Sequence, residues 1–297
     1  MKKQDFGGDW TEEKLDRVRK YLPAYTTIFN SNPKAKSLKT HYVDAFAGSG
    51  YRYKETNKIE YELFPELSQQ DTNKFLKGSA RIALEIEPSF NEYLFIDKDP
   101  QNVNELEKLK SEFPSKANSI KIFQADANVF LKEWVSKVDW KKCRAVVFLD
   151  PYGMDVEWSL IKSIANTKAI DLWILFPLGA VNRMLTKNTS PPQSWKDSLT
   201  KIFGTNDWEN YFYLSQSQLP ASQTNLFGEG PKIRDADFDK IKEYFIGRLE
   251  FVFTMVAKNV LILRNNNNVP LFMLCFAAGN PKGAPTAVKI ANEILGK

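Results

Sequence analysis

The stretch Ala145-Val146-Val147-Phe148-Leu149-Asp150-Pro151-Tyr152-Gly153 decides the fold class that we predict for this chain. Its uninterrupted apolar run is typical of a β-strand buried on both faces, as in a parallel sheet covered by helices. The run ends in a carboxylate and a proline. Because proline has no backbone N–H, Asp150 and the carbonyls beside it remain available as acceptors for an amine. Asp-Pro-x-Gly is also an ordinary turn signature, so both interpretations stay open.

Three earlier apolar runs also end in an acidic residue, and they predict three more strands. These runs are His41 to Asp44, Glu92 to Asp97 and Ile120 to Asp126. The carboxyl ends of parallel strands meet at one crevice, where α/β proteins bind their ligands. The four carboxylates are therefore expected to converge on one ligand in a Rossmann-like α/β fold.

The first run continues into a glycine turn, Ala45-Phe46-Ala47-Gly48-Ser49-Gly50. Glycines allow a backbone to approach a ligand closely, although a simple turn after a buried strand would look the same. A dinucleotide-binding site would need a third glycine where this chain has Tyr53, so a nicotinamide cofactor is disfavoured.

The second carboxylate suits the ribose of a nucleoside, and the third precedes a predicted helix. Asp97 ends the second predicted strand, where an acidic residue accepts hydrogen bonds from ribose hydroxyls in nucleotide-binding folds. A solvated turn aspartate is the alternative for Asp97. Asp126 is followed by Ala127 and a helical pattern.

The end of the chain predicts an antiparallel hairpin. Two apolar runs, Val256 to Leu263 and Val269 to Ala277, flank the polar stretch Arg264 to Asn268. A hairpin that closes a parallel sheet is expected of a methyltransferase fold and not of a dinucleotide-binding fold.

These motifs together resemble those of Rossmann-like S-adenosylmethionine methyltransferases that act on amino groups of nucleobases. The whole chain resembles the three-Cys-motif partner (TcmP) family more narrowly, through the following segments: Tyr21-Leu22-Pro23-Ala24-Tyr25, Asp44 to Gly50, Gly78-Ser79-Ala80, Asp150 to Gly153, Asp171-Leu172-Trp173, Phe176-Pro177, Phe203-Gly204 and Asp207-Trp208. The resemblance implies a class I methyltransferase fold with a mostly parallel seven-stranded sheet ending in an antiparallel hairpin, and a helical insertion.

The resemblance also implies a cofactor, site residues and partners. The cofactor is S-adenosyl-L-methionine, and the target is an exocyclic amine on a nucleic-acid base. Catalytic residues would be Asp150, Pro151 and Tyr152. Cofactor-binding residues would be Asp44, Phe46, Gly48, Gly50, Asp97, Asp126, Ala127 and Lys14, the last from a helix that closes over the cofactor. The family name implies a partner protein with a three-cysteine, radical-type iron-sulfur motif.

One departure keeps a second function open. Adenine and cytosine amino methyltransferases usually have two prolines before the aromatic residue, whereas Tyr152 directly follows Pro151 here. This form is more similar to that of tRNA guanine N2 methyltransferases. The alternative is a methyltransferase-like scaffold that serves its three-cysteine partner without catalysis.

Composition is consistent with a globular protein. The 297 residues are 43% hydrophobic, enough for a large core. The sequence has no signal-peptide pattern and no apolar run of about 18 residues, so we expect a cytoplasmic protein with no membrane segment. Cys143 and Cys275 are the two cysteines of the sequence, which predicts neither a bound metal nor a disulfide framework.

The sequence predicts four parts: a basic helical segment (1–40), a sheet domain (41–180 and 250–297), a polar lid-like insertion (51–77) and a helical insertion for substrate or partner (181–249). The first 40 residues hold nine Lys or Arg against five Asp or Glu, a surplus of four in a net charge of +5. This segment either contacts phosphates or presents Lys14, Arg17, Arg19 and Lys20 to solvent beside a buried stripe.

Overall fold

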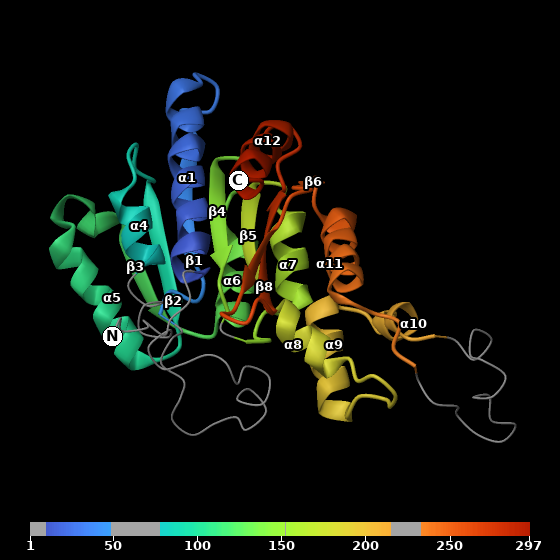
Figure 1. Cartoon of the computed structure of the whole chain (residues 1–297). Helices are drawn as coiled ribbons and strands as arrows, with labels where there is room; N and C mark the ends of the chain where they lie inside the picture. Colours follow the sequence, from blue (N-terminus) through green and yellow to red (C-terminus); the bar gives the residue numbers. More distant parts are fainter. Residues whose placement is uncertain (1–9, 49–77, 152, 215–232) are drawn as a thin grey trace, which may run out of the picture.

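The computed structural model describes residues 10–48, 78–151, 153–214 and 233–297. The predicted lid-like insertion (51–77), Gly50 and Tyr152 lie outside the described residues. Element labels follow Figure 1.

The sheet has the strand order β3-β2-β1-β4-β5-β8-β6, with β7 also pairing with β8 (Figure 1). The strands are β1 (Lys39–Asp44), β2 (Glu92–Asp97), β3 (Ile120–Gln124), β4 (Cys143–Leu149), β5 (Ile170–Phe176), β6 (Met255–Val256), β7 (Leu261–Arg264) and β8 (Pro270–Ala278). Strands β1 to β5 are parallel, and β8 is antiparallel to β5, β6 and β7. The predicted Rossmann-like fold with an antiparallel hairpin at its end is confirmed.

Helices cover both faces of this sheet. Helices α1 (Trp10–Ser31), α4 (Ser79–Glu85) and α12 (Ala284–Leu295) pack together, and α5 (Pro100–Glu112) packs on β2 and β3. A 3-10 turn (Pro114–Ser119) leads into β3. On the other face, α6 (Ala127–Lys137) packs against α7 (Trp158–Asn166), which contacts α11 (Phe238–Val252). Because both faces are covered, every residue of β5 and β8 is buried.

The C-terminal hairpin differs from the prediction in one respect. The run expected as a single strand, Val256 to Leu263, is divided into β6 and β7, so the sheet has eight strands among the described residues. Asn259 accounts for the break. Its backbone N–H donates to Asn292 Oδ1 at 2.9 Å, and its side chain donates to the Asn292 carbonyl at 3.0 Å. These bonds tie the chain to α12 and take it out of the ladder with β8.

The N-terminal helix also corrects an expectation. Leu15, Val18 and Leu22 form the predicted buried stripe, but Lys14 and Arg17 are buried with them. Arg17 lies 3.5 Å from Glu13 Oε1, so its charge is partly matched within the helix. The prediction that these two basic residues face solvent is therefore wrong, whereas Arg19 and Lys20 are exposed.

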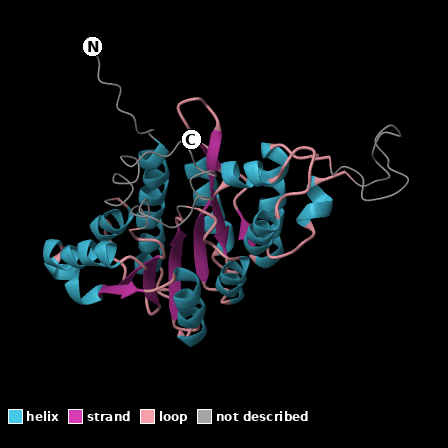
Figure 2. Cartoon of the chain, turned by 90° about the horizontal axis from the view of Figure 1, so that it is seen from below, coloured by secondary structure: helices cyan, strands magenta, loops and turns pink. Residues whose placement is uncertain are grey.

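The described part of residues 181–249 is mainly helical. It contains most of α8 (Leu178–Met184), all of α9 (Gln193–Phe203) and α10 (Trp208–Phe212), and most of α11. Arg234 ties the end of this region to α8 by donating to the carbonyls of Asn182 and Leu185, each at 2.9 Å. Helices α8 and α11 of this region pack against β8, and the view from below in Figure 2 shows helices on both sides of the strands. None of the helices in the described residues has the length and apolar character needed to cross a bilayer.

Gly204 ends α9 in a left-handed conformation with φ +69°. A Cβ at this position would overlap the Trp158 indole. The Arg248 guanidinium also lies over that indole, 4.7 Å from the ring centroid. Gly204 is therefore required both by its backbone angle and by the close packing of α9 on α7.

We predict that Gly204→Ala lowers the free energy of unfolding by about 1–3 kcal/mol, because it combines left-handed strain with a steric clash. Urea denaturation measures the change. The matched control is Gly247→Ala in the interior of α11, where an added Cβ would meet nothing within 4 Å. That change should be neutral or stabilise by up to about 1 kcal/mol. Equal effects of the two substitutions would contradict this account.

Candidate active site

The carboxyl ends of three adjacent strands place three aspartates along one edge of the sheet. Asp44 ends β1, Asp97 ends β2, and Asp150 directly follows β4. Each of these side chains belongs to a residue that is at most 5% exposed. Buried carboxylates are costly unless hydrogen bonds or opposite charges compensate them. The groups around each aspartate therefore indicate which kind of ligand this edge of the sheet can bind.

Lys14 compensates Asp150. Its Nζ lies 2.5 Å from Asp150 Oδ2, and Lys14 is 0% exposed. Burial lowers the pKa of Lys14 to about 8, against the opposing effect of Asp150. Burial raises the pKa of Asp150, and the ammonium of Lys14 opposes that rise. The pair joins the N-terminal helix to the end of β4 in the interior of the protein.

Asp44 is a second carboxylate beside the same lysine. Burial raises its pKa to about 7; a hydrogen bond from Ser79 opposes the rise, and the charge of Asp150 adds to it. The Phe46 N–H also approaches Asp44 Oδ1, at 3.4 Å. Asp44 is thus a carboxyl group that changes its charge near neutral pH.

Three buried oxygen atoms near this pair have no hydrogen-bond partner among the described residues. They are Asp44 Oδ2, Asp150 Oδ1 and the Tyr42 hydroxyl oxygen. Burial first, and then the charges of Asp44 and Asp150, raise the pKa of Tyr42 well above its ordinary value. Most buried polar groups in proteins are paired. Two unsatisfied carboxylate oxygens together therefore suit a ligand that donates hydrogen bonds or carries positive charge.

Asp97 holds the turn after β1 against the start of α5. Its Oδ1 accepts the Asp99 N–H at 2.7 Å. Burial raises the pKa of Asp97, while hydrogen bonds from the Asp99 N–H, Asn102 and the Gly48 N–H oppose the rise. A Cβ at Gly48 would lie 2.7 Å from Asn102 Cβ. Glycine is therefore needed for this close contact, which shapes the predicted cofactor edge.

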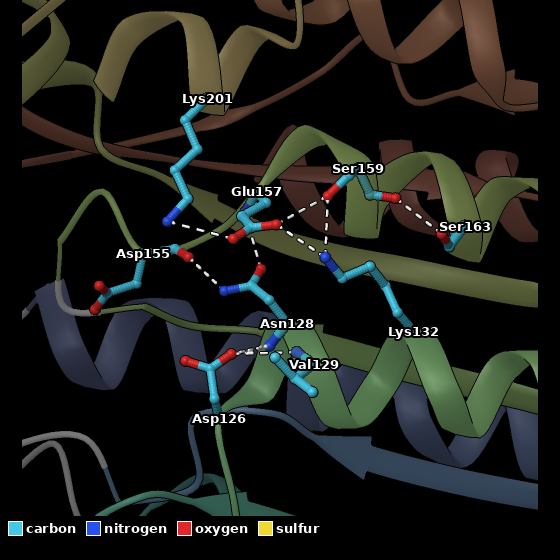
Figure 3. A network of polar contacts seen from close by, with 9 residues as sticks. All are labelled: Asp126, Asn128, Val129, Lys132, Asp155, Glu157, Ser159, Ser163 and Lys201. Atoms are coloured by element: carbon cyan, nitrogen blue, oxygen red, sulfur yellow. Dashed lines mark hydrogen bonds and ion pairs between the residues drawn. The ribbon is translucent and has the colours of Figure 1, made fainter. Parts of the chain in front are cut away.

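Asp126 begins α6 instead of ending β3, which stops two residues earlier. Its Oδ1 accepts the backbone N–H groups of Asn128 and Val129 at 2.9 and 3.1 Å (Figure 3). Asp126 is exposed, Ala127 is buried, and Val129 is 65% exposed. Capping of α6 thus uses one oxygen of the Asp126 carboxylate. The position faces solvent, and the apolar side chain of Val129 is accessible beside it.

The remaining predicted site residues divide between described and undescribed parts of the chain. Pro151 is buried, and Phe46 is half-buried against the core. Gly50 and Tyr152 lie outside the described residues.

The structure brings the predicted residues together in three groups. Lys14, Asp44 and Asp150 form the first group, Asp97 and Gly48 the second, and Asp126 with Ala127 the third.

Sequence reasoning missed Tyr42, although it lies two residues before Asp44 and so faces the same side of the strand. It left a turn role open for Asp150 but did not indicate the buried ion pair that this carboxylate makes with Lys14.

A separate polar hollow lies on the helical insertion. Its lining residues come from α9 and the region of α10, and include Lys196, Thr200, Lys201, Asn206 and Asn210. None of the predicted site residues lines it. Its lysines are also paired, Lys196 with Glu209 at 3.4 Å and Lys201 with Glu157 at 3.4 Å. The carboxyl edge of the sheet, with its unsatisfied oxygens, is therefore the better candidate for the active site.

No family model matches this chain, and no curated protein matches its sequence. Among solved structures, a Legionella pneumophila protein of the family DUF519 is 13% identical, with 97% of this chain and 92% of that chain covered and a TM-score of 0.49. A Thermobifida fusca protein assigned as a methyltransferase is 11% identical, with 91% and 82% covered and a TM-score of 0.35. The methyltransferase domain of a bacterial Hen1 protein is 10% identical, with 88% and 99% covered and a TM-score of 0.32.

We predict that Lys14→Met lowers the free energy of unfolding by about 3–5 kcal/mol at pH 7, because it leaves the Asp150 carboxylate buried without its counter-charge. The loss should shrink as the pH falls. Without Lys14 the folded-state pKa of Asp150 rises further above its unfolded value, so protonation at low pH removes the unfavourable charge. Urea denaturation between pH 5 and pH 8 measures both effects.

Two further variants control this prediction. The double variant Lys14→Met with Asp150→Asn should be more stable than Lys14→Met alone, since the carboxylate that lost its counter-charge is replaced by a neutral amide. Lys20→Met removes an exposed pair with Asp16 and should cost less than about 1 kcal/mol. A double variant that is no more stable than Lys14→Met would show that the ion pair is not the cause.

Proposed function

We propose that this protein is an S-adenosylmethionine-dependent methyltransferase that acts on an exocyclic amine of a nucleic-acid base. The buried charge group at the carboxyl edge of the sheet carries this proposal. Asp44 and Asp150 supply two carboxylates, and Lys14 supplies the one buried ammonium that the described residues place beside both of them. When both aspartates are ionised, one negative charge in the interior is unmatched within this group. A cationic ligand would supply the missing charge.

S-adenosylmethionine fits this requirement because its methionine part carries an ammonium and its sulfur is positively charged. Asp44 would face the cationic part, and Phe46, Gly48 and Gly50 would shape the slot. Asp97 would hold the ribose hydroxyls, while the Asp126 carboxylate and Ala127 would receive the adenine. When bound, the cofactor would supply an electrophilic methyl group on a sulfonium sulfur, which leaves as a neutral thioether.

Asp150 would orient the acceptor amine. Lys14 holds Asp150 Oδ2, and Asp150 Oδ1 has no partner among the described residues. The ammonium of Lys14 favours the ionised form of Asp150 against the effect of burial. An ionised Oδ1 and the Pro151 carbonyl would accept the two amine hydrogens and align the nitrogen lone pair. The transfer would then be accelerated mainly by position and orientation.

The nucleic-acid target and the partner protein are part of the same proposal. They rest on the resemblance of the sequence to the TcmP family. Tyr152, outside the described residues, would stack on the target base after it leaves the helix. The helical insertion (181–249) would provide the docking surface for nucleic acid or for the three-cysteine protein, since insertions give a shared fold its specificity.

A second candidate function is a scaffold that keeps the methyltransferase fold without turnover. The contact that favours it is the Lys14–Asp150 pair, because Lys14 already occupies one oxygen of the carboxylate that would receive the substrate. Transfer of tritium from labelled S-adenosylmethionine to bulk nucleic acid separates the two functions. Only the enzyme transfers the label.

We predict that the intact protein binds S-adenosylmethionine or its demethylated product in calorimetry. Asp97→Ala should weaken this binding by about 1–3 kcal/mol, the cost of lost hydrogen bonds to a charged acceptor. Asp97→Asn keeps one acceptor oxygen and should lose less.

Asp139→Ala is the matched control for this experiment. Asp139 is exposed and precedes β4, so it belongs to the opposite edge of the sheet. Its loss should leave binding unchanged. No detectable binding by the unmodified chain at millimolar cofactor would remove the proposed function.

We predict that cofactor binding strengthens as the pH rises from about 6 to about 7.5. The pKa of Asp44 is about 7, so at lower pH the cation must displace a proton from this carboxyl group. Each unit below the pKa should cost up to about tenfold in affinity. The groups that face Asp44 are Asp150, Lys14 and Tyr42, and loss of the proton from Lys14 near its pKa of about 8 makes the site more negative, so it does not reverse the rise at higher pH.

Calorimetry in two buffers of different ionisation enthalpy measures the proton released on binding. Release should be greatest near pH 6 to 7 and should vanish in Asp44→Asn, which binds more weakly at every pH. An affinity that is constant between pH 6 and pH 7.5 would rule out Asp44 as the partner of the cation.

A further inference from the structure

The loop between β4 and α7 carries the proposed chemistry, and a side chain of another element holds it. This loop begins at Asp150 and runs to Glu157, which precedes the first turn of α7. Its described residues have no regular secondary structure. Asn128, in the first turn of α6, reaches across to it (Figure 3).

The side-chain amide of Asn128 makes hydrogen bonds to this loop through both its nitrogen and its oxygen. Its Nδ2 donates to the Asp155 carbonyl at 2.8 Å, and its Oδ1 accepts the Glu157 N–H at 3.0 Å. Asn128 is 5% exposed, so water competes little for these bonds. An aspartate could not donate to the carbonyl, and an apolar residue could make neither bond. The position requires an amide.

Asn128 is also hydrogen-bonded to a residue on the proposed cofactor side of the site. The backbone N–H of Asn128 donates to Asp126 Oδ1 at 2.9 Å. Asn128 therefore links Asp126, proposed to receive the adenine, with the loop that follows Asp150, proposed to orient the acceptor amine.

Ion pairs around Glu157 reinforce this link from the surface. Glu157 Oε2 accepts from Lys132 Nζ and from the Ser159 hydroxyl, both at 2.9 Å, and Oε1 lies 3.4 Å from Lys201 Nζ of α9 (Figure 3). The hydrogen bond from Lys132 is the main cause that lowers the pKa of Glu157. The Lys201 side chain is 50% exposed. Exposed pairs contribute little, so the buried amide is the main connection.

We infer that Asn128 is a positioning residue for methyl transfer, which fixes the acceptor loop relative to the cofactor half of the site. The inference rests on the proposed function for its chemical consequence, but the tie between the loop and α6 is independent of any cofactor. Group transfer depends steeply on the alignment of the reacting atoms, so a loop displaced by about 1 Å can slow it by about a hundredfold.

Hydrogen exchange tests the tie directly. In Asn128→Ala, backbone amides of residues 153–157 should exchange at least about tenfold faster, above all the Glu157 N–H that Asn128 accepts, while those of β4 and β5 keep their wild-type rates. The control is Ser163→Ala, which removes a hydrogen bond to the Ser159 carbonyl within α7 and leaves Asn128 untouched. In Ser163→Ala the backbone amides of the loop between β4 and α7 should exchange at wild-type rates. Unchanged exchange in Asn128→Ala, or faster exchange throughout the sheet, would overturn the inference.

Two measurements separate positioning from simple stability. In Asn128→Ala the dissociation constant for S-adenosylhomocysteine should stay within about threefold of wild type, while single-turnover tritium transfer to bulk nucleic acid at saturating cofactor slows at least about tenfold. Affinity and rate that fall in parallel would contradict a positioning role. If the wild-type chain binds no S-adenosylhomocysteine, the proposed function fails, and loop exchange alone decides whether Asn128 holds the loop.

Discussion

The buried ion pair between Lys14 and Asp150 is the interaction on which the rest of the site depends. It requires α1 to lie across the face of the sheet with its first turns at the carboxyl ends of the strands. A second buried contact, the Tyr21 hydroxyl donating to Asp171 Oδ2 at 2.7 Å, holds the same helix near the start of β5. Burial raises the pKa of Asp171 to about 7, and the Tyr21 hydrogen bond opposes that rise. Both contacts would leave a costly buried polar group if α1 moved away.

The charge balance at this edge explains how the site can be stable without a ligand and still have a carboxyl group available for the proposed cationic ligand. Lys14 is matched by Asp150, so the helix is secured without a ligand. Asp44 remains beside them with a pKa of about 7, so this carboxyl group can be neutral or charged at little cost near neutral pH. A fixed ion pair beside a titratable carboxyl would let the edge accept the proposed cationic ligand without disturbing the packing of α1.

The proposed function at this edge also depends on loops that the strands of the sheet do not hold by themselves. The turn after β1 is held by Asp97 and by the contact between Gly48 and Asn102. The loop after β4 is held by Asn128, and Glu157 connects it to α9 through Lys201. Residues proposed to bind one ligand thus come from four separate parts of the chain, and amide or carboxylate side chains set their spacing.

The sequence by itself determined the strand pattern and the edge at which the carboxylates gather, because apolar runs and strand direction are local properties. It also indicated Asp44, Asp97 and Asp150, since each directly ends an apolar run. Only the tertiary structure decided that Lys14 is buried, because its partner lies 136 residues away and a helical pattern cannot identify it. The break at Asn259 and the tie made by Asn128 are equally non-local, since each depends on a hydrogen bond to an element distant in sequence.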